Sequence, residues 1–152
     1  MARQTVTISE LSGTDVKPLP FDHSLFDYGK QVIPVGTPEP PGYAGWRART
    51  HLNSAEYMDE FLVFLGASYF RAIPAGGNYG LSARGLSINS GIPGVPEEFP
   101  NFTRFVLQEP GVEGKTLTVL ALLEGESVAG AYRFVVTPGK ETVMEVEAEL
   151  TL

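Results

Sequence analysis

One short stretch of the chain combines aromatic and arginine side chains with closely spaced glycines. Residues 61–88 read FLVFLGASYFRAIPAGGNYGLSARGLSI, with glycines at 66, 76, 77, 80 and 85. Glycine lets the backbone turn sharply or lets another group approach closely. Aromatic rings beside guanidinium groups are suited to stacking on, and donating hydrogen bonds to, a polar ring-shaped ligand such as a sugar. We therefore predict a carbohydrate-binding surface here, with the candidate residues Tyr69, Arg71, Tyr79, Ser82 and Arg84.

Two upstream aromatic residues, Tyr43 and Trp46, extend the set of possible stacking platforms. The competing interpretation is that these aromatic rings fill a core and that the arginines cap strand ends or pair with acids. The glycine-rich residues 76–80 superficially resemble a phosphate-binding loop. They lack its lysine and its following helix, so a β-turn is favoured over a nucleotide site.

The carboxylates and histidines do not form a recognisable catalytic or metal-binding pattern. Glycosidases commonly use two carboxylates placed across the scissile bond, one with a raised pKa. Glu97 and Glu98 are adjacent and point apart on an extended chain, so a solvated turn is favoured. The only histidines, His23 and His51, lack a nucleophile motif and ligand spacing. We predict no catalytic residue, no metal ligand and no cofactor for this chain.

The composition favours a packed all-β domain. An apolar fraction of 43% with nine Phe and six Tyr is enough for a core. Seventeen Gly and twelve Pro suit short strands joined by turns and disfavour a helical bundle. At 152 residues the chain fits a single domain, 1–152.

The charge of the chain limits its partners. Eleven basic and eighteen acidic residues give a formal net charge of −7, which disfavours nucleic acid and anionic membranes as partners. A neutral oligosaccharide is not penalised by such a field.

Cysteine is absent, so disulfides and thiolate sites are excluded. We expect no membrane insertion, because no apolar run approaches the eighteen residues of a spanning helix. The N-terminus also lacks the pattern of a signal peptide.

Two-residue alternation and turn residues predict about eight strands in an antiparallel sandwich. We expect a long Pro- and Gly-rich loop over 18–45, a helical turn over 54–59 with Ser54 as N-cap, and a proline-rich turn over 91–100. The expected strands cover 4–9, 46–52, 59–65, 79–89, 103–108, 116–123, 130–137 and 141–152.

The last strand has the clearest pattern. Its apolar side carries Met144, Val146, Ala148, Leu150 and Leu152, and its other side carries Glu145, Glu147 and Glu149. A one-residue slip in register would bury three carboxylates at a cost of several kcal/mol each. The acidic side must therefore face water.

Several segments resemble one protein family in the same order along the chain. They include LGASYFRA and YGLSARGLSI, FDYGKQVIPVGTPEPPGYAGWR (21–47), EEFPNFTRFVLQEP (97–110), LTVLALLEGESVAGAYRFVVTPG (117–139) and TVMEVEAEL (142–150). Together they are similar to the periplasmic glucan biosynthesis proteins, OpgG and OpgD (also called MdoG and MdoD). The resemblance runs from about residue 6 to residue 150 and is far more specific than a single short motif.

The resemblance implies a galactose-mutarotase-like β-sandwich, an exported periplasmic protein and a β-1,2-linked glucan as ligand in osmoregulated periplasmic glucan synthesis. Family members are much longer, so the chain would be a truncated portion of the large sandwich domain. Some members are β-1,2-glucanases, but the acidic residues responsible lie in a later part that has no counterpart here. The resemblance thus implies one wall of a carbohydrate cleft without a complete active site.

Two alternatives stay open: a structural or engineered sandwich scaffold without a ligand and, less favoured, a β-1,2-glucanase. Truncation would also leave sheet edges exposed, and such edges favour self-association.

Overall fold

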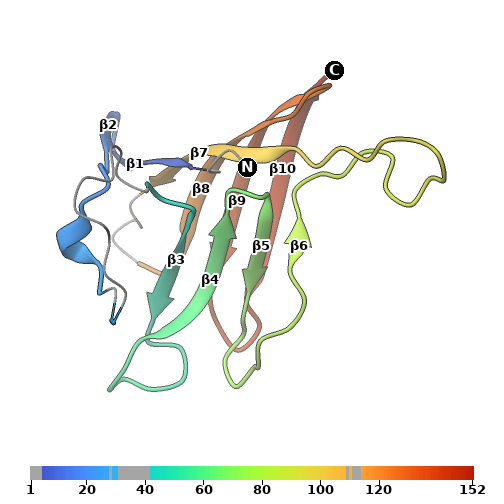
Figure 1. Ribbon diagram of the computed structural model, residues 1–152. Helices are drawn as coiled ribbons and strands as arrows, with labels where there is room; N and C mark the ends of the chain where they lie inside the picture. The colour runs from blue at the N-terminus through green and yellow to red at the C-terminus, as the bar shows by residue number, and fades with distance from the viewer. Residues whose placement is uncertain (1–4, 28, 31–41, 109, 111–113) are drawn as a thin grey trace.

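The computed structural model describes residues 5–27, 29–30, 42–108, 110 and 114–152, and these form two β-sheets (Figure 1). One sheet has six strands in the order β10-β9-β8-β7-β1-β2, and the other has four in the order β3-β4-β5-β6. The described part contains one short 3-10 helix, η1 (His23–Leu25), and no α-helix. The strands are β1 (Thr7–Ser12), β2 (Asp15–Pro18), β3 (Gly45–Thr50), β4 (Asp59–Leu65), β5 (Tyr69–Ala72), β6 (Ala83–Arg84), β7 (Asn101–Gln108), β8 (Leu117–Glu124), β9 (Ala129–Thr137) and β10 (Val143–Thr151).

The two sheets pack face to face through one apolar core, which confirms the predicted all-β sandwich. Phe64 on β4 is fully buried, and its ring lies 4.8 Å from that of Phe134 on β9, centroid to centroid. Aromatic rings from both sheets meet edge to face, an arrangement that adds to the gain from burying their area. The core residues are Val6, Ile8, Phe61, Leu62, Phe64, Phe102, Phe105, Val119, Ala121, Leu123, Val128, Tyr132, Phe134 and Val136.

A β-bulge in β4 decides which side chains of this strand face outward. Ala48 on β3 pairs with Leu62, but the next residue, Arg49, pairs with Glu60, so Phe61 is an extra residue in β4. Strict alternation would place Glu60 on the core side together with Leu62. The extra residue reverses the alternation of side chains, so Glu60 points to the outer side of the sheet.

The C-terminal hairpins follow the prediction closely. β7, β8, β9 and β10 pair in sequence as antiparallel neighbours. The other half of this sheet departs from the predicted antiparallel arrangement, because β1 pairs with β7 in parallel. The two strands are far apart in sequence, and the whole four-stranded sheet lies between them in the chain. A tight hairpin therefore does not fix their relative direction.

Three local predictions are wrong. The strand expected over 79–89 is reduced to β6, Ala83–Arg84. The expected helical turn over 54–59 is a series of bends, in which the Ser54 hydroxyl accepts a hydrogen bond from the Glu56 amide at 3.0 Å. Two strands, β2 and β5, were not predicted, and both have only four residues, which is too short for alternation to be visible.

Aromatic residues hold together the described ends of the loop expected over 18–45. The ring of Phe21 stacks on Phe26 at 4.9 Å and meets Tyr43 edge-on at 5.3 Å, centroid to centroid. The Tyr43 hydroxyl donates to the carbonyl of Pro20 at 3.1 Å. The prolines expected to interrupt this loop, at 34, 38, 40 and 41, lie outside the described residues.

Strand β10 lies at the edge of the six-stranded sheet, and both of its sides are open. Its glutamates face away from the core, as predicted, because Val146 pairs with the inward Phe134 of β9. The apolar side is less covered than the pattern suggests, since Val146 is 46% and Leu150 45% exposed. Within the described residues, no helix has the length and apolar character needed to cross a bilayer.

Candidate functional site

The outer face of the four-stranded sheet brings together most of the predicted site residues. Arg47 on β3 pairs with Val63 on β4, which pairs with Arg71 on β5, so these three form one row across the sheet. In the next row, Tyr69 on β5 pairs with Arg84 on β6. The alternate residues of the same strands build the core, so this row and the next point outward. We call this surface the arginine–tyrosine face, formed by Arg47, Glu60, Tyr69, Arg71, Tyr79, Arg84 and Phe99.

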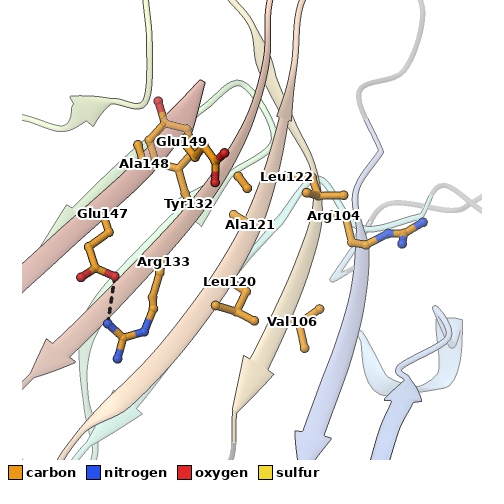
Figure 2. Close-up of a pocket in the computed structure, with 11 residues that line it drawn as sticks. Arg104, Val106, Leu120, Ala121, Leu122, Tyr132, Arg133, Glu147, Ala148 and Glu149 are labelled. Atoms are coloured by element: carbon orange, nitrogen blue, oxygen red, sulfur yellow. Dashed lines mark hydrogen bonds and ion pairs between the residues drawn. The ribbon is translucent and has the colours of Figure 1, made fainter. Parts of the chain in front are cut away.

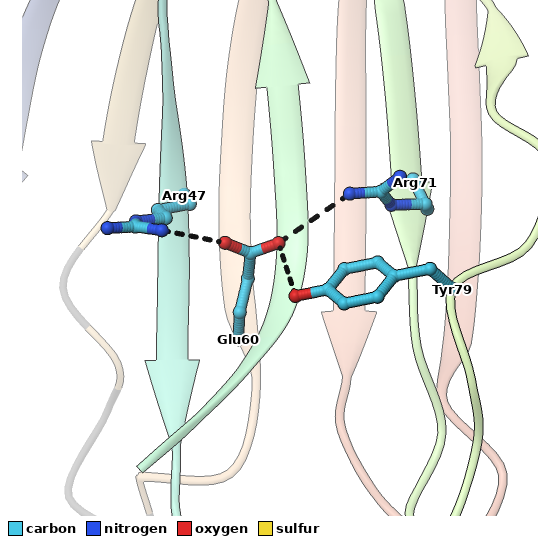
Figure 3. Close-up of polar contacts among 4 residues, drawn as sticks. All are labelled: Arg47, Glu60, Arg71 and Tyr79. Carbon is cyan, nitrogen blue, oxygen red and sulfur yellow. Dashed lines mark hydrogen bonds and ion pairs between the residues drawn. The ribbon is translucent and has the colours of Figure 1, made fainter.

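Glu60 is the centre of the first cluster on this face (Figure 3). One of its carboxylate oxygens lies 3.2 Å from Nη1 of Arg47. The other lies 3.6 Å from Nη2 of Arg71 and accepts a hydrogen bond from the Tyr79 hydroxyl at 3.2 Å. The Glu60 side chain is only 12% exposed, so it is one of the better shielded charges of the described chain. One carboxylate thus contacts two guanidinium groups and a phenol.

The same cluster contains a cation–π contact. The guanidinium carbon of Arg71 lies 4.4 Å from the centroid of the Tyr79 ring, which is 63% exposed. The Nε of Arg71 is buried and has no hydrogen-bond partner among the described residues. A buried donor without an acceptor is costly.

A second cluster is built around Arg84. Its guanidinium carbon lies 4.1 Å from the Tyr69 ring and 4.4 Å from the Phe99 ring, so it is stacked between two aromatic residues. Nη1 donates to the carbonyl of Ala67 at 3.2 Å, and Nη2 donates to the Tyr69 hydroxyl. This arginine is therefore held in one orientation by stacking and by hydrogen bonds.

Gly85 allows β6 to hold Arg84 close to the core. A Cβ on Gly85 would lie 2.8 Å from the ring of Phe102, so a larger residue would push β6 away. The Gly85 amide donates to the carbonyl of Ser68 at 2.7 Å. The sequence prediction that glycines permit close approach is confirmed at this position.

Four of the five predicted residues, Tyr69, Arg71, Tyr79 and Arg84, therefore lie in two clusters on one surface. Ser82 is exposed one residue before β6, and none of the contacts that define the clusters involves it. Trp46 is not a stacking platform, because it points into the core and stacks on Phe64 at 5.0 Å.

Tyr43 is held in the aromatic loop instead, with its ring against Phe21.

Sequence reasoning missed Glu60 and Phe99. The expected strand over 59–65 includes Glu60, but the place of Glu60 on the outer face depends on the bulge, which strict alternation does not predict. Phe99 follows two acids in a loop, and no pattern in the sequence links it to Arg84.

Three acids near the face, Asp59, Glu97 and Glu98, accept hydrogen bonds from neighbouring loops. The Glu98 carboxylate accepts hydrogen bonds from the Ser127 hydroxyl at 2.6 Å and the Ser127 amide at 3.0 Å. These bonds hold the pKa of Glu98 below its usual value, opposite to the shift a general acid needs. The pKa of Asp59 is also lowered, chiefly by the Asn53 amide, which donates to it at 2.9 Å. Glu97 accepts a hydrogen bond from the Gly91 amide at 2.9 Å.

His51 lies in the loop after β3, where its Nδ1 is 3.0 Å from the carbonyl of Tyr57. His23 is the first residue of η1. Among the residues that the structure describes, no group of three or more histidine, aspartate and glutamate side chains is placed to hold a metal ion.

Two grooves lie near the outer faces of the sheets. One, of about 600 Å³, adjoins the arginine–tyrosine face at Arg47 and is lined by Phe21, Phe26, Tyr43, Val63 and Leu65 among others.

The other, of about 560 Å³, lies on the outer face of the six-stranded sheet (Figure 2). Its floor is apolar, with Leu120 and Leu122, and its rim carries Arg104 and the Arg133–Glu147 ion pair at 3.1 Å. Of these two grooves, the first combines several aromatic walls with one member of the arginine–tyrosine face, Arg47.

The fold and the site together define a class: a β-sandwich protein whose candidate site is an exposed sheet face with arginines stacked on aromatic rings. Comparison with known families is more specific. The model of the family described as "Periplasmic glucan biosynthesis protein, MdoG" matches residues 1–152. The chain belongs to this family, which confirms the resemblance found in the sequence.

Individual relatives agree with this assignment. The glucans biosynthesis protein G of Pseudomonas aeruginosa is 44% identical over 147 residues, which cover 97% of this chain and 28% of the relative. The protein of the same name from Ralstonia nicotianae is 45% identical over 147 residues, covering 97% of this chain and 29% of the relative. That from Cereibacter sphaeroides is 52% identical over 110 residues, covering 72% and 20%. The chain therefore spans less than a third of the length of these curated relatives.

Proposed function

We propose that this chain contributes one wall of a carbohydrate-binding cleft that handles the β-1,2-linked glucan backbone during periplasmic glucan biosynthesis. The observation that carries the proposal is the pair of arginines stacked on aromatic rings on one exposed face, Arg71 on Tyr79 and Arg84 between Tyr69 and Phe99. Membership of a family described by periplasmic glucan biosynthesis supports both the ligand class and the periplasmic location.

The chemistry of this face suits a neutral sugar polymer. Exposed aromatic rings offer apolar surfaces to the C–H faces of pyranose rings, and fixed guanidinium groups donate hydrogen bonds to hydroxyls. Because Glu60 and the aromatic rings already hold the arginines in place, little side-chain entropy is lost when a ligand binds. The adjoining groove lined by Phe21 and Phe26 would extend the same surface along β3.

A titration tests this proposal directly. Addition of a β-1,2-linked gluco-oligosaccharide should shift the NMR signals of the Tyr69 and Tyr79 rings, with saturation at a dissociation constant of about 1 mM or tighter. Trp46 should respond little, because its ring is stacked on Phe64 within the core. A cello-oligosaccharide of equal length is the control for linkage. An unchanged tyrosine spectrum at saturating ligand would contradict the proposal.

The main alternative is a sandwich scaffold with no ligand of its own. The continuous aromatic core supports it, since such a core needs no ligand to fold. Cooperative unfolding together with an unchanged spectrum in the same titration would favour this alternative.

We further propose that this chain lacks a complete active site. Glu97 and Glu98, which come just before Phe99 of the face, are used as acceptors by backbone and serine donors. Release of reducing ends from β-1,2-glucan by the purified chain would instead revive the glucanase alternative.

Self-association through the edge of β10 is a separate proposal. Among the described residues β10 pairs with β9 alone, so its other edge presents unpaired backbone groups, and the apolar Val146 on this strand is 46% exposed. Exposed edges of this kind invite pairing with another strand. We expect light scattering to show a mass above 16.4 kDa that increases with concentration, and Val146→Lys to reduce it. Leu81→Lys is the control, because Leu81 is 99% exposed and lies in the loop before β6, away from β10. A constant monomer mass would contradict the proposal.

A further inference from the structure

We propose that Ser127 and Glu98 position the ring of Phe99, and that this positioning raises the affinity of the arginine–tyrosine face for the gluco-oligosaccharide. The inference rests on the proposed function and names two positioning residues for its site. Ser127 lies in the turn between β8 and β9 of the six-stranded sheet, while Arg84, on which Phe99 stacks, lies on β6 of the other sheet. In this way one sheet orders a binding residue of the other.

Phe99 gives Arg84 its second aromatic partner. The Phe99 ring lies 4.4 Å from the guanidinium carbon of Arg84, and the Tyr69 ring lies 4.1 Å from it. Tyr69 is held by strand pairing, because it lies opposite Arg84 in the register of β5 and β6. Phe99 comes from the segment before β7 instead and is 43% exposed. Strand pairing does not hold this ring, so its position depends on the residues on either side of it.

The β8–β9 turn packs against both neighbours of Phe99. The Ser127 hydroxyl donates to one carboxylate oxygen of Glu98 at 2.6 Å, and the Ser127 amide donates to the other at 3.0 Å. Pro100 is fully buried, and a Cβ on Gly125 would lie 2.9 Å from its Cγ. The same Cβ would collide with the Glu98 carboxylate. Glycine at position 125 therefore permits the turn to approach both neighbours.

The contact with Ser127 leaves Glu98 little freedom. A carboxylate whose two oxygens both accept short hydrogen bonds has one favoured orientation. The main chain of Glu98 is fixed as well, because it exchanges two backbone hydrogen bonds with Ile88, at 2.9 and 3.1 Å. The bonds from the Ser127 hydroxyl and amide also lower the pKa of Glu98, so the contact is intact at neutral pH. Phe99 follows directly in the chain, and a ring ordered before the ligand arrives costs less binding free energy.

One test of this inference needs no ligand. The Arg84 guanidinium lies between two aromatic rings, whose ring currents shift the NMR signal of its Nε proton. In Ser127→Ala the hydroxyl donor is lost, so the Arg84 signal should move towards its position in Phe99→Ala. The Arg71 signal should stay unchanged, because Arg71 stacks on Tyr79 in the separate cluster. Ser127→Thr retains the hydroxyl and should leave both signals in place.

The second test measures affinity for the β-1,2-linked gluco-oligosaccharide by calorimetric titration. Phe99→Ala should lower the affinity about tenfold, because a stacking surface and the ordering of Arg84 are lost. Ser127→Ala should lower it about threefold, because the Phe99 ring must then be ordered by the ligand. In a Phe99→Ala background, Ser127→Ala should have no further effect, since the ring on which it acts is absent. Ser90→Ala removes a hydroxyl from an exposed residue in the loop before Phe99 and should bind like the wild type.

A second variant keeps the test independent of one substitution. Glu98→Gln weakens the same contact from the other side and should reproduce each result of Ser127→Ala. An unmoved Arg84 signal in both variants would overturn the inference. A loss of affinity that persists in the Phe99→Ala background would also overturn it, because Ser127 would then act by another route. Full affinity in both variants would overturn it and leave the proposed function standing. If the wild-type chain binds no oligosaccharide, both are overturned.

Discussion

Phe64→Ala is expected to cost about 3–5 kcal/mol in the free energy of unfolding, a large fraction of the roughly 5–15 kcal/mol by which a domain is typically stable. Phe64 is fully buried, and its ring lies 5.0 Å from Trp46, 5.5 Å from Phe70 and 4.8 Å from Phe134, centroid to centroid. Truncation would open a cavity at the point where both sheets meet, and the rigid rings around it cannot collapse to fill it. Urea unfolding followed by Trp46 fluorescence measures the loss.

Two further variants make this result interpretable. Phe64→Leu keeps most of the apolar volume and should remain folded at a smaller cost. Leu81→Ala removes a side chain that is 99% exposed, and its free energy of unfolding should change by less than about 0.5 kcal/mol. If Phe64→Ala proved as stable as Leu81→Ala, the two sheets would not share the core described above.

The strands that the sequence predicts best are those with both alternation and a nearby partner. β7 to β10 have eight or nine residues each, and short connections, 125–128 and 138–142, join the last three of them. Residues 79–89 show what alternation alone leaves undecided. A strand needs backbone hydrogen bonds to a neighbour, and the neighbour here, β5, has only four residues. Only Ala83 and Arg84 find partners on it, and Leu81 is left 99% exposed.

The candidate site is predictable where it depends on residue type and on the alternation of side chains along a strand. Tyr69 and Arg71 lie two residues apart and must share a side of any strand. Trp46 lies two residues before Ala48, so both are on the apolar side of β3. This alternation already argued against a role for Trp46 on the surface. The position of Glu60 was not predictable in the same way. It depends on a bulge, and a bulge arises from the packing of two strands rather than from the pattern of one.

Glu60→Ala is expected to lower the affinity for the gluco-oligosaccharide by about tenfold, equivalent to about 1.4 kcal/mol. Glu60 does not need to touch the ligand for this effect, since it acts as a positioning residue. Without its carboxylate, Arg47 and Arg71 lose the ion pairs at 3.2 and 3.6 Å that orient them, and the Tyr79 hydroxyl loses its acceptor. Freed side chains must then be ordered by the ligand, which costs binding free energy. Calorimetric titration measures the change.

The same substitution should also destabilise the fold by about 1–3 kcal/mol, because it leaves Arg71, which is 27% exposed, without its charged partner. Glu60→Gln separates the two effects. Its amide oxygen still accepts hydrogen bonds from Arg71 and Tyr79, so affinity should fall less than in Glu60→Ala. Glu149→Ala, on the exposed acidic side of β10, should change neither affinity nor stability. A Glu60→Ala protein that is folded and binds with full affinity would show that Arg71 and Tyr79 are ordered without Glu60, or that the ligand does not use them.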